Sequence, residues 1–378
     1  MSVDRDPWLL TPGPLTTSDT VKRAMLHDWG SRDRRFIAIN ADVRRRLLEL
    51  AGASESHVTV PVQGSGTFSV EAMLTTLTPR DGKLLILVNG AYGKRMAKIC
   101  SYAGRAHDVY ETAEDTPPDV AEVKRRLAAD PAITHVAAVY CETTSGILNP
   151  IAEIAATVKA AGRSLLIDAM SAFGALPIDA ASVPFDALAA SSNKCLEGVP
   201  GMGFVLIRKS VLERCAGNAP SLSLDLHDQW KAMEGNGQWR FTPPTHVIAA
   251  FHQALEEHTA EGGVEGRGRR YRENCKILVD GMRALGFETL LPDALQAPII
   301  VTFRMPADPR FRFQEFYDRL SAKGYVIYPG KLTVADSFRI GCIGRLGATE
   351  MKDALAAIRA TLRELGVENG APARVAAE

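Results

Sequence analysis

The sequence has no excess of charge of either sign. Its 378 residues include 44 Lys and Arg against 44 Asp and Glu, so the formal net charge is zero. Nucleic-acid-binding proteins usually carry a basic excess, and clusters of basic residues draw proteins to anionic membranes. The charge balance therefore predicts neither a nucleic-acid partner nor a membrane-surface partner.

Long apolar runs and paired cysteines are also missing. No stretch of about 18 apolar residues occurs, which argues against a transmembrane helix. The opening MSVDRDPWLLTPGP has charges and prolines where a secretory signal needs an apolar segment. The six cysteines form no CxxC pair, and no histidine cluster accompanies them at metal-ligand spacing. We expect a reduced cytoplasmic protein without a metal site.

The segments that are present alternate between short apolar runs and amphipathic stretches. Two helices are predicted first, one capped at Ser18 and one over 40–50, capped by its Asn or Asp. Strands are then expected at 57–64, 83–90, 135–143, 164–170, 186–194 and 201–209, and helices at 65–77, 91–104 and 151–162. This alternation predicts an α/β fold, a mostly parallel sheet covered by helices on both faces.

The length suits two domains better than one, and the pattern changes after Gly262. A long helix is predicted over 263–286, followed by strands at 297–305 and 336–344 and helices at 313–324 and 348–365. We therefore expect an extended N-terminal arm (1–17), a large domain (18–262) and a small α+β domain (263–378). The tail from Val367 is expected to be frayed.

The segment Gln63–Gly64–Ser65–Gly66–Thr67 lies between a predicted strand and a predicted helix. Glycines allow close backbone approach to an anion, and a helix N-terminus offers free N–H donors, so the segment could bind a phosphate. A turn with an ordinary Ser or Thr cap explains it equally well. The spacing matches neither a P-loop nor a dinucleotide-binding fingerprint.

Two ionisable residues follow apolar strands. Asp168 ends the run LLID, and Lys194 follows AASSN on the next strand. A buried carboxylate needs a partner such as a protonated pyridine nitrogen, and a desolvated lysine becomes a usable amine nucleophile. The alternatives are a capping aspartate and a solvated surface lysine. If the two strands are neighbours, both side chains point into one crevice at the carboxyl edge of the sheet.

The segments SGT, ETTSG, LLIDAMSAFG, SSNKCLEGVPGMGF and SFRIGCIG carry a resemblance in their order along the chain. They resemble the class V aminotransferase branch of the fold-type I enzymes that depend on pyridoxal 5′-phosphate. The opening LLTPGPLTTS and the segment DWGSRD extend the resemblance, within that branch, to the 2-aminoethylphosphonate–pyruvate aminotransferases. It covers nearly the whole chain, to about Leu365.

The resemblance implies roles for individual residues. Lys194 would hold the cofactor as a Schiff base and move the proton, and Asp168 would pair with the pyridine nitrogen. The phosphate would be held by Ser65, Gly66 and Thr67, with Ser191 or Ser192. Tyr92 would stack on the cofactor, unless it is a core tyrosine, and Thr144 would lie near the phenolic oxygen, with Thr143 as its rival. Trp239 and Thr242 would reach the phosphate of a partner subunit, which implies a homodimer with shared sites.

The resemblance also implies two substrate-binding arginines. Arg339, in SFRIG, would bind the substrate carboxylate, and a guanidinium does form a planar two-pronged contact with carboxylates. A salt-bridged strand arginine is the alternative. Arg32 is the candidate for the phosphonate, with Arg34 and Arg35 as neighbours, unless Arg339 serves both anions.

The expected reaction is a ping-pong transamination. The amino group of 2-aminoethylphosphonate passes to the cofactor, leaving phosphonoacetaldehyde, and then to pyruvate, giving L-alanine. An alanine–glyoxylate or serine–glyoxylate aminotransferase would share every cofactor residue, and a protein that binds the cofactor without turnover is the non-enzymatic alternative. A desulfurase is disfavoured because Cys195 should point away from Lys194. The run RGRRYR at 267–272 is expected to be a solvated helix face.

Overall fold

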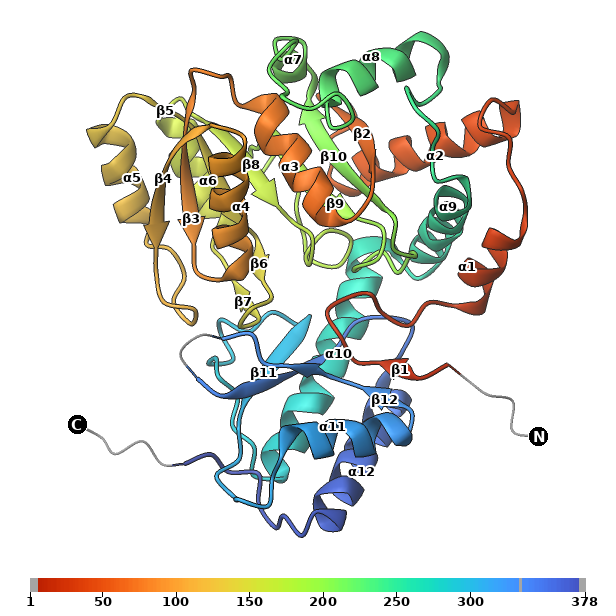
Figure 1. The fold of residues 1–378 in the computed structure, drawn as a ribbon, viewed down its shortest axis with the longest axis vertical. Coiled ribbons are helices and arrows are strands. Elements are labelled where there is room, and N and C mark those ends of the chain that lie inside the picture. Colours follow the sequence, from red (N-terminus) through yellow and green to blue (C-terminus); the bar gives the residue numbers. More distant parts are fainter. Residues whose placement is uncertain (1–5, 333–334, 374–378) are drawn as a thin grey trace.

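The fold is described by a computed structural model for residues 6–332 and 335–373 (Figure 1). Its main sheet has seven strands in the order β2-β10-β9-β8-β5-β3-β4. All neighbouring pairs are parallel except the two that β10 makes, with β2 and β9. The strands are β2 (His57–Gln63), β3 (Lys83–Val88), β4 (Ala106–Glu111), β5 (Ile133–Val139), β8 (Ser164–Asp168), β9 (Ala187–Ser191) and β10 (Met202–Arg208).

Helices cover both faces of this sheet, so most of its strands are buried on both sides. One apolar cluster joins the strands to α2 (Arg34–Leu50), α5 (Val120–Ala129), α6 (Ile151–Ala160) and α9 (Thr245–Ala260). A second cluster joins the opposite face to α3 (Gly66–Leu77), α4 (Ala91–Tyr102) and α8 (Leu226–Asn236). The apolar runs of the sequence are thus the strands of a two-faced core, as parallel sheets require.

A third apolar cluster lies in the C-terminal part of the chain, drawn in blue at the bottom of Figure 1. A three-stranded antiparallel sheet, β11-β14-β13, packs there. The strands of this small sheet are β11 (Ile300–Arg304), β13 (Tyr328–Pro329) and β14 (Ser337–Gly341). The helices of the C-terminal part are α10 (Gly263–Ala284), α11 (Phe313–Ala322) and α12 (Ala348–Glu364). The predicted α/β class, with a mostly parallel sheet and a small α+β part, is confirmed.

The N-terminal arm is held by this C-terminal part. β1 (Trp8–Leu9) pairs with β12 (Tyr325–Val326) in a parallel ladder, and α1 (Asp19–Arg23) begins after the predicted cap Ser18. The Ser18 side chain accepts a hydrogen bond from the backbone N–H of Val21. The arm is therefore extended at Trp8–Leu9, where backbone hydrogen bonds fix it, and it bends at residues 11–14.

Three local predictions were wrong. The helix expected over 40–50 begins at Arg34, because Asp33 caps it, and Asn40 is a buried residue inside it. The RGRRYR run is not solvated, because Arg267 and Tyr271 are buried at 1% and 0% exposure. The tail from Val367 is packed as far as it is described: Val367 is buried, and the N–H of Gly370 donates to the carbonyl of Leu285. Residues 374–378 of that tail lie outside the described residues.

Candidate active site

A cavity of about 440 Å³ lies at the carboxyl ends of β8 and β9. Strands β8 and β9 are parallel neighbours, with Asp168 opposite Ala189, so they direct Asp168 and Lys194 to the same edge, as predicted. The lining residues include Gly13, Gly64, Ser65, Gly66, Thr67, Tyr92, Arg95, Thr143, Asp168, Met170, Ser191, Asn193 and Lys194. Residues far apart in the sequence therefore meet in one cavity.

Asp168 is the last residue of β8 and is 4% exposed. Its Oδ1 accepts one hydrogen bond, at 3.0 Å, from the backbone N–H of Met170. Burial raises the pKa of this carboxyl to about 6, with that backbone N–H opposing the rise. Such a carboxylate is stabilised by a cation placed in the cavity.

Lys194 lies in the turn that follows β9. Its Nζ donates to the backbone carbonyls of Pro12, at 2.7 Å, and Gly13, at 3.0 Å, so the N-terminal arm contacts the amine directly. Burial lowers the pKa of Lys194, and the positive charge of Lys331 adds to the lowering. A lowered pKa increases the fraction of neutral, nucleophilic amine, which is the property expected of this lysine.

The Ser65–Gly66–Thr67 segment forms the first turn of α3 and lines the same cavity. Ser65 is the N-cap residue, yet its side chain makes no capping hydrogen bond. A Cβ at Gly66 would lie 2.4 Å from the Sδ of Met170, so a larger residue would have to displace the Met170 side chain, which also lines the cavity. The free hydroxyl favours the anion-binding interpretation of this segment over a simple cap.

Tyr92 and the ETTSG segment form another wall. Thr143 lines the cavity, whereas Thr144 does not: its Oγ1 donates to Glu142 at 2.6 Å and accepts from the N–H of Ala91. Glu142 is fully buried and also accepts from the N–H of Tyr92, so it fixes the start of α4. Burial raises the pKa of Glu142. The rival Thr143 therefore has the better position, and Glu142 is a residue that sequence analysis missed.

Cationic side chains surround Tyr92. The guanidinium of Arg95 lies 4.9 Å from its ring centre and donates to Thr67 Oγ1 at 3.0 Å. Arg339 is 5% exposed, and its Nε and Nη1 donate to the carbonyls of Pro329 and Thr143. Arg339 is therefore held against Thr143, which lines the cavity, but Arg339 is not itself a lining residue. Arg95 was not predicted; its only signal is its position one helical turn after Tyr92.

Other predicted residues lie outside this cavity within the single chain. Trp239 and Thr242 line a second cavity of about 710 Å³, which shares Gly64 with the first. Arg32 is exposed before α2 and lines neither cavity. Ser191 lines the first cavity, whereas the Ser192 hydroxyl donates to the carbonyls of Val199 and Met202. Ser191 is therefore the better placed of the two serines.

A buried ionic cluster supports the turn that carries Lys194. Glu197 has φ 57°, and its Oε1 accepts from Tyr271 at 2.6 Å and Arg270 at 2.8 Å. Arg267 donates to the carbonyl of Cys195 and pairs with Glu261 at 2.8 Å. Tyr271 and its neighbouring arginines thus bind α10 to the lysine turn, which explains why the RGRRYR run is buried.

The neighbouring Cys195 is fully buried. Burial raises the pKa of its thiol to about 12. A thiol in this state is a poor nucleophile, which agrees with the prediction that it takes no part in chemistry.

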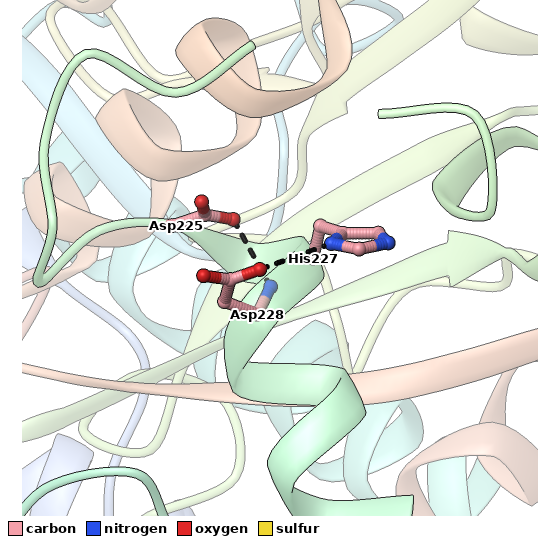
Figure 2. Close-up of side chains that lie close together, drawn as sticks. All are labelled: Asp225, His227 and Asp228. Atoms are coloured by element: carbon pink, nitrogen blue, oxygen red, sulfur yellow. Dashed lines mark hydrogen bonds and ion pairs between the residues drawn. The ribbon is translucent and has the colours of Figure 1, made fainter. Parts of the chain in front are cut away.

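Within residues 6–332 and 335–373, one group of side chains has metal-like proximity: Asp225, His227 and Asp228 at the start of α8 (Figure 2). The sequence did not predict that a histidine lies close to two carboxylates. Asp225 caps α8 by accepting from the N–H of Asp228, and Asp228 contacts His227 at 3.2 Å and Arg240 at 3.4 Å. These contacts already account for the cluster as a helix cap.

The Aminotransferase class-V family model matches residues 19–319. The chain belongs to the class V aminotransferase family. This class V aminotransferase is 58% identical over 361 residues to the 2-aminoethylphosphonate–pyruvate transaminase of Pseudomonas putida strain GB-1, covering 96% of this chain and 98% of that protein. Over 366 residues it is 57% identical to the protein of the same name from Pseudomonas aeruginosa strain UCBPP-PA14, covering 97% and 99%.

Solved structures agree on the fold. The ureidoglycine–glyoxylate aminotransferase of Bacillus subtilis superimposes with a TM-score of 0.88 at 23% identity, covering 96% of this chain and 94% of that chain. The pyridoxamine–pyruvate aminotransferase of Mesorhizobium loti gives 0.87 at 24% identity, covering 98% and 96%. In the described residues, no helix is long and apolar enough to cross a membrane.

Proposed function

We propose that this class V aminotransferase transfers the amino group of 2-aminoethylphosphonate to pyruvate, giving phosphonoacetaldehyde and L-alanine. The observation that carries the proposal is the meeting of Lys194, with a lowered pKa, and the buried Asp168 in one cavity. The curated relatives at 57–58% identity have this activity in their names, which supports the choice of substrates.

The cofactor is pyridoxal 5′-phosphate, and the cavity fits it on three observations. Asp168 is a buried carboxylate that needs a cation, which the protonated ring nitrogen provides. The buried Ser191 hydroxyl has no hydrogen-bond partner among the described residues, and Ser65 leaves its hydroxyl free at the start of α3. Ser65, Gly66, Thr67 and Ser191 would hold the phosphate, and Tyr92 would stack on the ring.

When bound, this cofactor supplies an aldehyde carbon for amines and an electron sink for the carbanion. The protein supplies the proton transfer and the orientation. Lys194 Nζ would take the proton from the carbon that bears the donor's amino group and deliver it to the aldehyde carbon of the cofactor, and it would move a proton in the opposite direction in the second half-reaction. Asp168 would keep the ring nitrogen protonated, and Thr143, which lines the cavity, would orient the ring from the ETTSG wall.

Two anions must enter one site in turn, because pyruvate follows the aminophosphonate in a ping-pong reaction. Arg339 is buried and preorganised by two backbone carbonyls, which leaves its remaining N–H groups for an anion. We infer that Arg339 binds the carboxylate of pyruvate. Arg32 remains a candidate for the phosphonate only if a partner subunit brings it to the site.

We further propose a homodimer with shared sites. The second cavity adjoins the first at Gly64, and it carries Trp239 and Thr242 together with the exposed Phe68, Leu222 and Phe241. Apolar exposure of this kind is typical of an interface. A cytoplasmic location is supported by six cysteines that are all buried and free. We keep the division into an arm (1–17), a large domain (18–262) and a small domain (263–378), which the third apolar cluster supports.

An amine screen tests the function. The purified protein is given pyridoxal 5′-phosphate and pyruvate, and alanine formation is followed with 2-aminoethylphosphonate and other amines. We expect turnover with 2-aminoethylphosphonate, at least about 1,000-fold lower in Lys194→Ala, since Lys194 carries both the covalent and the proton-transfer roles. Activity confined to glyoxylate with alanine or serine would replace the substrate assignment, and a protein with no turnover of any amine would contradict the enzyme assignment.

A further inference from the structure

Lys331 is a second cation beside the cavity, and no sequence motif identified it. It follows β13, which pairs with β14 so that Tyr328 lies opposite Arg339. Its Nζ lies 4.4 Å from the centre of the Tyr92 ring, and Tyr92 lines the cavity. Lys331 contacts Tyr92 and Arg339 donates to the carbonyl of Thr143, so both cations lie directly behind residues that line the cavity, although neither lines it itself.

The two cations differ in how firmly they are held. Arg339 is buried and fixed by the carbonyls of Pro329 and Thr143. Lys331 is half-buried; within residues 6–332 and 335–373 it contacts the ring of Tyr92 and pairs with no carboxylate. A lysine in contact with an aromatic face can exchange that contact for an anion, because four rotatable bonds carry its ammonium group.

The charge around Lys331 also favours an anion. Burial is the largest single influence on both neighbouring groups, acting to raise the pKa of Tyr92 and to lower the pKa of Lys194, and the positive charge of Lys331 acts to lower both pKa values. Arg95 lies over the same ring, but it already donates to Thr67 on the phosphate-loop side. Among the described residues near Tyr92, Lys331 and Arg339 are thus the cations that keep N–H donors for the substrate.

The two substrates place different demands on this wall. A carboxylate is planar with one charge, which the fork of a single arginine matches. A phosphonate has a third oxygen outside that plane, and like a phosphate monoester it takes a second negative charge near neutral pH. We propose that Lys331 binds the phosphonate group together with Arg339, and so selects the aminophosphonate without being needed for pyruvate. This inference rests on the proposed function.

Ping-pong kinetics separate the two halves of the test, because kcat/KM for each substrate reports its own half-reaction. We expect Lys331→Met to lower kcat/KM for 2-aminoethylphosphonate about 10- to 100-fold, the usual loss of a charge-assisted hydrogen bond, and to change kcat/KM for pyruvate less than about threefold. Lys331→Arg should recover most of the loss. The matched control is Lys323→Met, which removes a lysine paired with Glu364.

Anion binding gives a second measurement that does not depend on turnover. Calorimetry on the cofactor-loaded protein should show methylphosphonate binding more tightly than acetate, and Lys331→Met should remove the difference. Equal losses for both substrates, or an unchanged kcat/KM for the aminophosphonate, would overturn the proposal. If the wild type does not turn over 2-aminoethylphosphonate, the proposed function fails. In that case Lys331-dependent binding of methylphosphonate supports the anion site, and its absence overturns it.

Discussion

At the residue scale, burial acts on Asp168 and Lys194 in the same direction, favouring the neutral form of each. Asp168 has one backbone N–H as partner and a pKa of about 6, and Lys194 has two carbonyls as partners and a lowered pKa. Burial of these two ionisable groups therefore lowers the stability of the cofactor-free protein. The bound cofactor would remove both penalties, because its ring nitrogen offers Asp168 a cation and its aldehyde offers Lys194 a covalent partner.

Asp168 predicts a pH dependence for the cofactor-free protein. Its folded pKa of about 6 lies above the ordinary 3.8, so the folded state binds the proton more tightly and is stabilised at low pH. That contribution is present below about pH 4 and is lost as the pH rises through 6, by about 3 kcal/mol in total for a shift of about two units. Denaturant unfolding of the cofactor-free protein between pH 4.5 and 7.5 measures it.

Asp168→Asn is the control for this prediction, because an amide does not titrate. The difference in unfolding free energy between the variant and the wild type should move in favour of the variant as the pH rises. Bound pyridoxal 5′-phosphate should cancel the trend in the wild type. Parallel pH profiles for the two cofactor-free proteins would show that the Asp168 carboxyl titrates normally.

At the element scale, α10 fixes the turn after β9. Arg267 is 1% exposed and binds the carbonyl of Cys195, while Arg270 and Tyr271 bind Glu197, the one non-glycine residue with positive φ among those described. Such a backbone conformation persists only where its surroundings enforce it. The cluster therefore holds the lysine turn in place.

Removing the buried member of this cluster should cost much more than removing an exposed ion pair. We expect Arg267→Met to lower the unfolding free energy by about 3–5 kcal/mol, because Glu197 and Glu261 lose a buried partner. Arg125→Met, which breaks an exposed pair with Glu122, should cost less than about 1 kcal/mol. Urea unfolding at one protein concentration compares them, and similar losses would contradict a supporting role for the cluster.

At the scale of the whole molecule, the second cavity is the predicted subunit contact. Phe241 is 50% exposed beside Trp239 and Thr242. A charge there would be desolvated in a dimer, so Phe241→Asp should convert the dimer to a monomer and lower activity at least about tenfold. Light scattering after size-exclusion chromatography measures the mass. Tyr102→Asp, at an 84% exposed position on α4, should remain dimeric; a Phe241→Asp dimer would place the interface elsewhere.

The sequence by itself determined the features that depend on a few consecutive residues. Apolar runs and their spacing predicted the sheet and its covering helices, and the motif order predicted Asp168 and Lys194 on adjacent strands. The Ser65–Gly66–Thr67 segment was predicted because glycine and hydroxyl residues at a helix start have a local meaning. The predicted strands and the helix start agree with the structure because strand alternation and helix capping are decided within a few residues of chain, whereas the phosphate role of the segment stays a prediction.

The tertiary structure alone decided which of several equivalent residues face the cavity. Thr143 and Thr144 are the same residue type, and only the packing of Glu142 against α4 places Thr144 away from the cavity. Arg267 was wrongly expected to be solvated. Its acidic partners Glu197 and Glu261 come together only when α10 packs behind the lysine turn, and the sequence pattern does not show that packing. Lys331 belongs to no recognisable sequence motif. It became a candidate for substrate binding because the pairing of β13 with β14 places it beside Tyr92. Each outcome depends on contacts between distant segments, and a one-dimensional pattern contains no information on those contacts.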